Sequence, residues 1–344
     1  MTAFDMANHV HNTERTSDFD RRAQPAEAPM TALSADQTTQ DLLAGLGLPG
    51  ADGHGLPASA EGFPDGSQYR VEIPSVEGPR CLEAVLAEAD RLAVPVARVS
   101  QGTGVGLLRD AEIAEMVAMA AEAGVEVSLF ARPCAGWDTS AMARSPMGSL
   151  LAPCARGQDQ LAAVIDEIRR AADLGIRSVL VADVGVLAVF GRLRASGALP
   201  AQMQAKVSVM LPAANAAAAR VFADLGADTL NLPTDLTLAQ ISAIRSATPL
   251  PLDIYVEAPD NLGGFVRHYE LPRMVEVAAP AYLKFGLRNA PDVYPSGGHL
   301  EATTVKLGRE RVRRARLGLD LLRRSGSAAV GSGPGAPGLA LCVR

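Results

Sequence analysis

The chain has 344 residues, 48% of them hydrophobic, with a formal net charge of -6 at pH 7 and a pI near 5.5. This is enough apolar material for a large core, and the acidic balance argues against non-specific binding to nucleic acid or to an anionic membrane. No apolar run reaches the roughly 18 to 20 residues of a spanning helix. The N-terminus lacks the apolar region of a signal peptide, and the cysteines (Cys81, Cys134, Cys154 and Cys342) lack CxxC spacing. We therefore expect a cytoplasmic protein with reduced thiols.

Composition divides the chain into three parts. Residues 1–66 are rich in Ala, Asp, Gly, Pro, Ser and Thr, with little apolar periodicity outside the short run TQDLLAGL. They are predicted to form a mostly disordered leader. Residues 325–344, SGSAAVGSGPGAPGLALCVR, are of low complexity and are predicted to be a disordered tail. The folded domain is then expected over residues 67–324.

Short apolar runs alternate with helical stretches throughout this middle part. The predicted strands are, in chain order, YRVEIPS, PVARVSQ, VEVSLFAR, RSVLVAD, KVSVML, DTLNLP, PLDIYVE and AYLKFGL. The stretches between them carry helix-end signals. Pro79 suits a first turn, Asp110 is a predicted N-cap, Gly124 a C-terminal stop, and Thr237 and Gln240 have capping-box spacing. Eight strand-helix units of about 25 to 35 residues predict a (β/α)8 TIM-type barrel, with a doubly wound open sheet as the structural alternative.

The polarity of the strands predicts what lies inside the barrel. Side chains of a barrel strand point alternately to the helices and to the barrel axis, so the apolar set is expected to face the helices. In PLDIYVE the polar set is Asp253, Tyr255 and Glu257. The same rule predicts an interior with five cations (Arg70, Arg98, Arg132, Lys206 and Lys284) and four carboxylates (Glu72, Glu126, Asp253 and Glu257). Such charges must be paired, because an isolated buried charge is costly.

The fourth predicted strand departs from this pattern, because Asp183 shares its parity with the apolar Val179 and Val181. Barrel chemistry collects at the carboxyl ends of the strands. This position selects Glu77, Ser100, Gln101, Arg132, Asp183, Asn231, Glu257, Asp260, Lys284, Arg288 and Asn289.

Lys284 is informative because the chain has only three lysines, Lys206, Lys284 and Lys306, and Lys284 lies in a predicted strand. A buried lysine can act as a base or form a Schiff base with a carbonyl substrate. The alternative is an ion pair with Glu257 or Asp253 on the neighbouring strand.

Carboxylates on separate strands also suit a general base or a hard divalent cation such as Mg2+ or Mn2+. Glu72 and Glu257 have this placement, although a structural pairing of Glu72 with Arg70 or Arg98 explains it as well. Within reach of the mouth the sequence offers two histidines, His268 and His299, both in predicted loops. His299 is a candidate acid or base.

Two connections are candidates for substrate contact. SQGTGVGLL, residues 100–108, joins a strand to a helix, and its backbone N–H groups either cradle an anion or form a tight turn. The long connection after the third strand, ARPCAGWDTSAMARSPMGSLLAPCAR, contains Trp137, Asp138 and Arg144 and is predicted to cover the substrate. Its two cysteines, without a histidine partner, make a zinc site unfavourable.

Residues 175–261 resemble the central part of the peptidase U32 family, the collagenase-like proteases. Asp183 and Gly185 match the family's Asp-x-Gly element, and ADLGADTLNLPTDLTLAQI resembles its helix, strand and following helix start. The resemblance implies the barrel and, nominally, a hydrolase. The chain departs from the family after the seventh strand, where Glu257 to Asn261 replace the His-Gly-x-x-Cys segment, so only Asp183 carries over as a site residue.

Two classes of function follow from these patterns. The first is an enzyme acting on a small anionic or carbonyl-containing substrate, either a U32-like hydrolase or a lyase or isomerase that uses Lys284 and a carboxylate base. Its catalytic candidates are Glu72, Asp183, Glu257 and Lys284, and its substrate-binding candidates are Arg98, Gln101, Arg132, Asn231, Asp260, Arg288, Asn289 and His299. The second is a non-catalytic barrel that binds a metabolite or a partner. The sequence leaves the cofactor undetermined, with the divalent metal considered above as a candidate, and leaves the oligomeric state open.

Overall fold

The computed structural model describes residues 38–45, 55–133 and 153–344 and divides the chain into two compact units, Met1–Gly55 and Leu56–Arg344. In the first unit the described element is the short helix α1 (Thr39–Gly45), preceded by Thr38, whose hydroxyl donates to Asp41. Most of the predicted leader and nearly all of the predicted covering loop lie outside the described residues. Within the described part of the chain, no helix has the length and apolarity required to cross a membrane.

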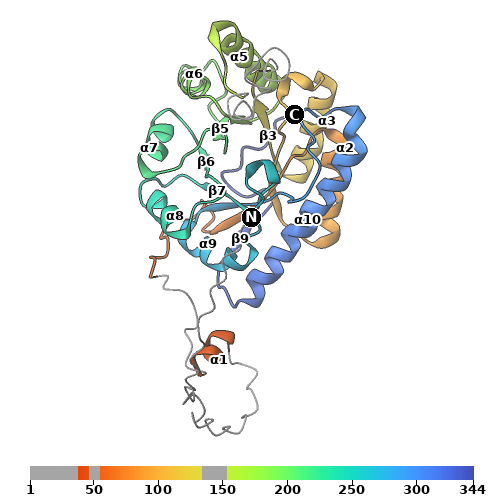
Figure 1. Cartoon of the computed structure of the whole chain (residues 1–344). Coiled ribbons are helices and arrows are strands. Elements are labelled where there is room, and N and C mark those ends of the chain that lie inside the picture. The colour runs from red at the N-terminus through yellow and green to blue at the C-terminus, as the bar shows by residue number, and fades with distance from the viewer. Residues whose placement is uncertain (1–37, 46–54, 134–152) are drawn as a thin grey trace, which may run out of the picture. The chain divides into compact units, whose positions relative to one another are not determined.

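The second unit is a closed barrel of eight parallel strands ringed by helices (Figure 1). The barrel strands are β1 (Tyr69–Pro74), β2 (Val96–Ser100), β3 (Glu126–Ala131), β4 (Ser178–Val181), β5 (Gln204–Val207), β6 (Thr229–Asn231), β7 (Leu252–Glu257) and β8 (Ala281–Phe285). Each strand pairs with the next, and β1 pairs with both β2 and β8, which closes the sheet. The predicted (β/α)8 barrel is therefore confirmed.

The helices of this unit are α2 (Pro79–Leu92), α3 (Asp110–Ala123), α5 (Gly157–Asp173), α6 (Val184–Ala195), α7 (Ala216–Asp224), α8 (Leu238–Arg245), α9 (Leu271–Ala278) and α10 (Glu301–Arg324). Most of the predicted end signals are confirmed: Pro79 begins α2, Gly124 ends α3 with φ 66°, and Thr237 and Gln240 form the capping box of α8. The N-cap prediction for Asp110 is wrong. Arg109 occupies that position, and its backbone N–H donates to Glu112, so that Asp110 falls in the first turn.

Two kinds of core lie on the two sides of the sheet. Apolar side chains of the strands, such as Val71 and Ile73 of β1, pack against the helices in one large cluster. The nine charged side chains that the alternation rule selected are all buried. The rule also holds for β4, whose Val179 and Val181 belong to the helix-facing core.

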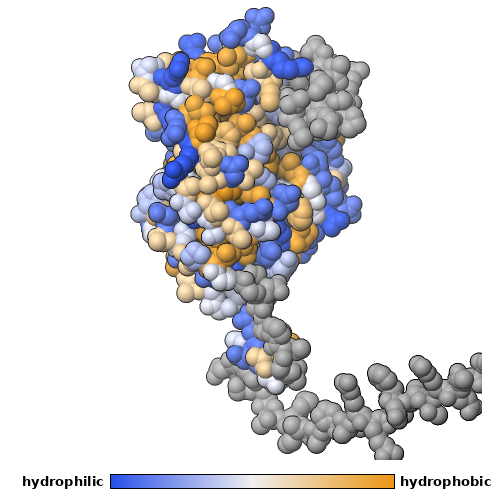
Figure 2. Space-filling model, turned by 60° about the vertical axis from the view of Figure 1, so that its left-hand side comes forward, coloured by the Kyte–Doolittle hydropathy of each residue, from blue (hydrophilic) through white to orange (hydrophobic). Residues whose placement is uncertain are grey.

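On the outside of the ring the helices are not uniformly polar. Figure 2 shows apolar side chains among polar ones on the face that carries α6 and α7, and exposed apolar residues of these helices include Val184 and Val221.

The C-terminal tail differs from the disorder expected of its composition. Residues 331–332 form the short strand β9 (Gly331–Ser332) beside the start of β1, and the chain then crosses the amino end of the barrel. Arg70 Nη2 donates to Pro337 O at 2.7 Å, and the backbone N–H of Ala340 donates to Glu126 Oε2 at 3.2 Å. The glycines and prolines of the tail give an irregular backbone, whose polar groups are satisfied by the barrel rather than by a regular element.

The segment before β1 closes the same end. The Phe63 ring lies 4.0 Å from the guanidinium of Arg70 and 5.3 Å from the ring of Tyr282. The amino end of the barrel is thus covered by residues from both ends of the unit, which leaves the carboxyl end as the place to search for a site.

Candidate functional site

The interior charges form one network centred on Glu72 of β1 and Arg98 of β2, both fully buried. Arg98 Nε donates to Glu72 Oε2 at 2.8 Å, and Arg98 Nη2 donates to Asp253 Oδ1 at 2.5 Å. Ser100 donates from Oγ to Glu72 Oε1 at 2.7 Å. The guanidinium also lies 3.5 Å from the centre of the Tyr282 ring. The pairing of Glu72 with Arg98 considered from the sequence is therefore the observed arrangement.

Both interior lysines join this network, Lys206 from across the barrel and Lys284 from the strand next to β1. Lys206 of β5 donates to Glu72 Oε1 and lies 3.3 Å from Asp253 Oδ2. Lys284 of β8 lies 3.3 Å from Glu72 Oε1 and donates to Asn231 Oδ1 at 2.7 Å. Its ammonium is 4.4 Å from the centre of the Tyr255 ring. One carboxylate oxygen of Glu72 thus lies between two ammonium groups.

Lys206 and Lys284 are each the next-to-last residue of their strand, and Lys284 differs from Lys206 in its contact with Asn231. Asn231 is the last residue of β6, and Lys284 is the next-to-last residue of β8, so their contact lies at the carboxyl end of the barrel. Asn231 is itself fixed, because its Nδ2 donates to Val207 O at 3.0 Å. The prediction that Lys284 pairs with Glu257 or Asp253 is replaced by a contact with Glu72.

The electrostatics of the network follow from this crowding. Burial alone would raise the pKa of Glu72, but the charges of Arg98, Lys206 and Lys284 hold it well below its usual range. Burial, aided by the charge of Arg98, lowers the pKa of Lys206 to about 7 against the opposing effect of Glu72. An amine with this pKa exchanges its proton near neutral pH, which is the property required of a general acid or base.

Glu257 does not share this site, and its predicted orientation toward the interior is wrong. The pairing of β7 with β8 shifts register between Tyr255 and Glu257, so Glu257 stands opposite the helix-facing Phe285. Its Oε1 accepts the backbone N–H of Arg288 at 3.0 Å, and its Oε2 lies 3.7 Å from Arg314 of α10. One extra residue in the strand therefore reverses the face on which the carboxylate stands.

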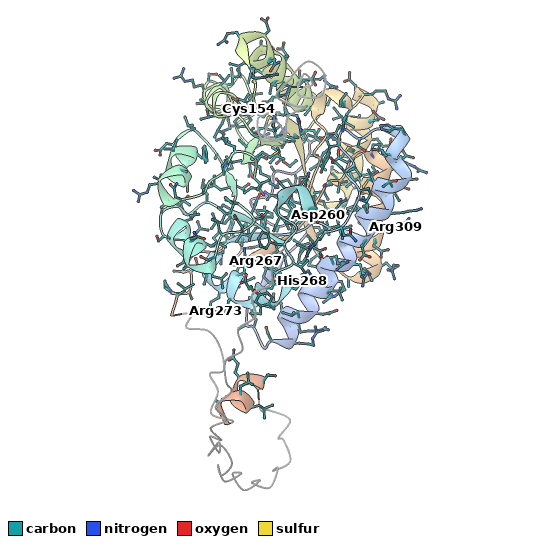
Figure 3. All side chains as sticks on the ribbon, viewed as in Figure 1. Cys154, Asp260, Arg267, His268, Arg273 and Arg309 are labelled. Atoms are coloured by element: carbon teal, nitrogen blue, oxygen red, sulfur yellow. The ribbon has the colours of Figure 1, made fainter. Side chains whose placement is uncertain are left out.

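His268 completes the surroundings of Glu257 on the helix side of the sheet. The segment between β7 and α9 carries this residue (Figure 3), whose Nε2 lies 3.6 Å from Glu257 Oε2 and whose ring packs edge-on to Phe285. Although burial alone would raise the pKa of Glu257, His268 and the backbone N–H of Arg288 hold it below its ordinary value. A metal site that joins Glu72 to Glu257 is not formed, since the two carboxylates face opposite sides of the sheet. Among the described residues, no group of three His, Cys, Asp or Glu side chains is placed to hold a metal ion.

Asp183 has a local structural explanation. Its Oδ1 accepts the backbone N–H of Val186 at 2.8 Å as the N-cap of α6, and its Oδ2 accepts that of Ala155 at 3.1 Å. A Cβ at Gly185 would lie 3.1 Å from Asp183 Oδ1, so the Asp-x-Gly element suits a tight cap. The nearby Cys154 is a weak nucleophile, because burial and the charge of Asp183 raise the pKa of its thiol.

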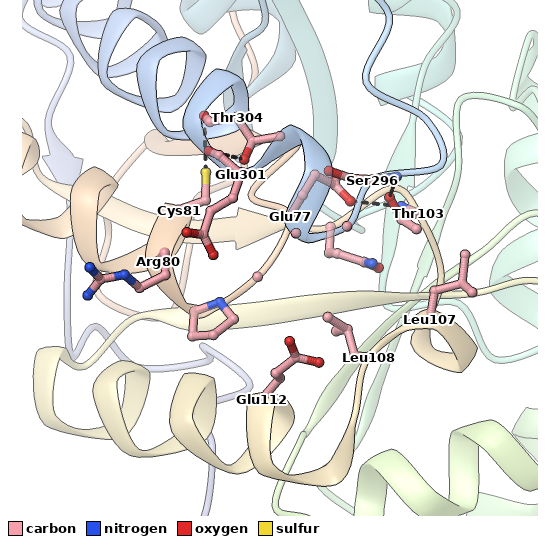
Figure 4. A pocket seen from close by; sticks show the side chains of 15 residues that line it. Glu77, Arg80, Cys81, Thr103, Leu107, Leu108, Glu112, Ser296, Glu301 and Thr304 are labelled. Carbon is pink, nitrogen blue, oxygen red and sulfur yellow. Dashed lines mark hydrogen bonds between the residues drawn. The ribbon is translucent and has the colours of Figure 1, made fainter.

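The glycine-rich connection after β2 uses its N–H groups on the protein itself. Gly102 N and Thr103 N donate to the two carboxylate oxygens of Glu77, at 2.7 and 3.0 Å. Gln101 is buried and bonds Gly104 through both ends of its amide. The anion cradle considered from the sequence is therefore occupied by Glu77, whose pKa burial raises. Glu77 lines a small cavity of about 60 Å³ beside Cys81 and Thr304 (Figure 4), which has room for water rather than for a substrate.

The other predicted binding residues are spread over the mouth. Asp260 accepts the backbone N–H of Asn289 at 2.5 Å and lies 3.8 Å from Arg288 Nε, and the side chains of Asp260 and Arg288 are more than half exposed. His299 is exposed. Arg132 is buried, with its guanidinium 5.2 Å from the centre of the Phe130 ring. Asp260, Arg288 and Asn289 share no hydrogen bond or ion pair with the Glu72 network within the described part of the chain.

Three residues at the mouth were missed by the sequence reasoning. Ser75 follows β1 with a left-handed backbone, φ 58°, which is unusual for a residue other than glycine. Tyr294, from the connection between β8 and α10, contacts Ser75 through the two hydroxyl groups at 2.5 Å. Arg311 of α10 donates from Nη1 to Ser75 O at 3.3 Å. The prediction considered residues near the ends of the strands, so it could not select Arg311 on a helix or Tyr294 in the later part of a loop.

Fold and site together define a (β/α)8 barrel with a charged, internally paired interior and a lysine at its carboxyl end. The model of peptidase family U32 matches residues 153–258, from the segment before α5 through the end of β7. This segment of the chain is therefore similar to that family, as the sequence predicted. No curated protein matches the sequence.

Several solved structures are similar to this chain. A U32 peptidase is 19% identical, with 58% of this chain and 73% of that protein covered and a TM-score of 0.35. A truncated 3-deoxy-D-arabino-heptulosonate 7-phosphate synthase from Thermotoga maritima is 14% identical, with 77% and 94% covered and a TM-score of 0.41. The dimeric archaeal Rubisco of Hyperthermus butylicus is 12% identical, with 78% and 65% covered and a TM-score of 0.44.

Proposed function

We propose that this U32-family barrel is an enzyme that takes a small anionic or carbonyl-containing substrate at the carboxyl end of its strands, with Lys284 as the reacting group. The observation that carries the proposal is the setting of the Lys284 ammonium, held by Asn231 at 2.7 Å and by Glu72 at 3.3 Å beside the Tyr255 ring. A lysine ordered in this way at the mouth of a barrel suits lyase or isomerase chemistry through an imine.

The chemistry requires Lys284 to lose a proton before its nitrogen adds to the substrate carbonyl carbon. The neighbouring Lys206 is suited to manage protons near neutral pH, because its pKa is lowered to about 7 and it shares Glu72 Oε1 with Lys284. Addition gives a carbinolamine, whose hydroxyl takes back a proton from Lys206 and leaves as water to give the protonated imine. The carboxylate of Glu72 compensates the positive charge of that imine.

Hydrolysis, which the family name suggests, has less support among the described residues. Cys154 has a raised pKa, and Glu257 and His268 stand on the helix side of the sheet. One observation favours a non-catalytic binding barrel instead. The Glu72 carboxylate is fully buried and surrounded by its own partners, as a purely structural network would be.

Borohydride trapping tests the proposal. The protein is incubated with dihydroxyacetone or pyruvate, reduced with sodium borohydride, and mapped by peptide mass spectrometry. We expect the reduced adduct on Lys284, its loss in Lys284→Arg, and its retention in the matched control Lys306→Arg, which alters an exposed lysine of α10. Adducts confined to Lys306 or to the terminal amine would refute imine chemistry and favour the binding barrel.

A further inference from the structure

Arg311 of α10 is a buried cation outside the interior network. Its residue exposure is 5%, and its side chain makes a single hydrogen bond, from Nη1 to Ser75 O at 3.3 Å. Its Nε is buried without a partner, and no carboxylate in the described part of the chain lies within 4.0 Å of the guanidinium. A counter-charge among the described residues that feels Arg311 is the buried carboxylate of Glu77, which Arg311 does not contact directly. A buried guanidinium with no carboxylate in hydrogen-bonding contact is costly, so this side chain is expected to serve a partner from outside the protein.

Other buried arginines of the barrel are differently placed. Arg98 is paired with Glu72 and Asp253, and Arg70 is 3.5 Å from Asp65 and donates to the tail. Arg245, which also lacks a carboxylate, donates to several backbone carbonyl groups instead. Arg311 has neither a carboxylate nor such a set of acceptors. Since Nη1 is used by Ser75, the edge formed by Nε and Nη2 is the one that remains for a bidentate acceptor.

The surroundings of Arg311 connect it to the candidate site. Its positive charge acts on Tyr255 and Tyr294, opposing the rise in the pKa of each phenol that burial causes. The centre of the Tyr255 ring in turn lies 4.4 Å from the Lys284 ammonium, so Tyr255 interacts with both cations.

The backbone beside Arg311 is strained in the manner of a functional site. Ser75 adopts a left-handed conformation while its hydroxyl contacts Tyr294 and its carbonyl accepts from Arg311. Strain of this kind persists where the surroundings enforce it. Here it aims the Ser75 carbonyl at one side of the guanidinium and leaves the other side unbonded.

We propose that Arg311 is the oxyanion-binding group of the candidate site, whose Nε and Nη2 edge receives the carboxylate or phosphate of a substrate that presents its carbonyl group to Lys284. The inference rests on the proposed function and narrows the substrate class to carbonyl compounds that carry an oxyanion. Carboxylate and phosphate share the pair of oxygens that a guanidinium edge recognises, and two matched pairs of compounds separate them.

The test compares dihydroxyacetone phosphate with dihydroxyacetone, and pyruvate with hydroxyacetone. Calorimetric affinities are measured for the wild-type protein, Arg311→Met, Arg311→Lys and the control Arg80→Met, which removes an exposed guanidinium from α2. We expect the wild-type protein to bind one charged compound at least tenfold more tightly than its uncharged counterpart. Arg311→Met should abolish that preference, Arg311→Lys should retain part of it, and Arg80→Met should leave it unchanged. The pair that shows the preference identifies phosphate or carboxylate.

Thermal unfolding without ligand checks that the variants fold. Arg311→Met removes a buried charge that no carboxylate contacts directly, so its midpoint should be close to that of the wild-type protein. If the midpoint falls markedly while every variant keeps the anion preference, Arg311 is a structural support of Ser75 and the inference is overturned. Equal binding of charged and uncharged compounds by the wild-type protein would overturn it as well.

Failure of the inference and failure of the proposed function give different results. If dihydroxyacetone is trapped on Lys284 and Arg311 has no effect on any affinity, the proposed function stands and the anion role falls. If no compound is trapped on Lys284 but an anion preference depends on Arg311, the anion site stands without the imine chemistry.

Discussion

Replacing Glu72 with Gln should destabilise the barrel strongly, because this side chain holds the interior network together. Gln keeps the size of the side chain but removes the charge and turns one acceptor oxygen into a donor NH2 group. If the NH2 group takes the place of Oε2, it faces Arg98 Nε, which lies 2.8 Å from Oε2 in the wild-type protein. If it takes the place of Oε1, it faces the two lysines and Ser100. Either orientation brings donor groups together. Removing one partner of a buried ion pair costs about 3 to 5 kcal/mol. Asp253 still compensates Arg98, which places the expected loss near the lower end, at about 3 kcal/mol.

The matched control is Glu126→Gln, a second fully buried carboxylate that faces Arg98. Its nearest oxygen is 3.7 Å from Arg98 Nη1, and its other oxygen accepts the backbone N–H of Ala340, which an amide oxygen can also do. We expect a loss of about 1 kcal/mol. Urea unfolding followed by far-ultraviolet circular dichroism measures both free energies of unfolding. Equal losses for the two variants, or a loss below about 1 kcal/mol for Glu72→Gln, would refute the assignment of Glu72 as the centre of the network.

Three further predictions follow from individual contacts. The pKa of Lys206 is lowered from 10.5 to about 7 in the folded protein, so between these pH values the unfolded chain binds more protons than the folded chain. The free energy of unfolding should therefore rise with pH above about 7, by up to about 1.4 kcal/mol per pH unit. Urea unfolding across this pH range should show the rise in the wild-type protein and not in Lys206→Met. Asp183→Ala should cost about 1 to 2 kcal/mol through loss of the α6 cap, whereas Asp183→Asn should keep the cap bond to Val186 and lose only the acceptor for Ala155. Both variants should retain the borohydride adduct, and its loss in both would instead indicate a catalytic carboxylate. Deleting residues 329–344 should lower the thermal midpoint, because Arg70 and Glu126 lose acceptor and donor groups of the tail, and an unchanged midpoint would show that the tail is dispensable.

The identity of the buried charges could be predicted from the sequence because strand alternation is a local property of the chain. Arg98, Lys206 and Asp253 follow the period of two within their own strands, and no knowledge of a neighbouring strand is needed to assign their face. Their partners are a different matter. Which carboxylate meets Lys284 depends on the stagger between strands, which is why Glu72 was found where Glu257 or Asp253 was expected.

The orientation of Glu257 could not be predicted for a related reason. The shift of register after Tyr255 is a property of the pairing of β7 with β8, and the sequence LDIYVE alternates without any glycine or proline to mark it. The tail escaped prediction because low complexity describes its composition and not its contacts. Its hydrogen bonds use backbone groups that every residue type offers, at a distance in sequence that no local pattern reports.

Arg311 illustrates a signal that the sequence does contain. The buried residues of α10 recur at helical spacing, namely Thr304, Gly308, Arg311, Val312, Ala315, Gly318, Leu319 and Leu322. Arg311 is the one charged member of that set, on a helix whose other arginines lie outside it. A cation on the apolar stripe of an otherwise amphipathic helix requires a buried partner, and the sequence of α10 supplies no acid on the same stripe. Helix periodicity therefore identifies a buried cation as well as strand alternation does. In this barrel the two rules lead to two cations, Lys284 and Arg311, that both act on Tyr255.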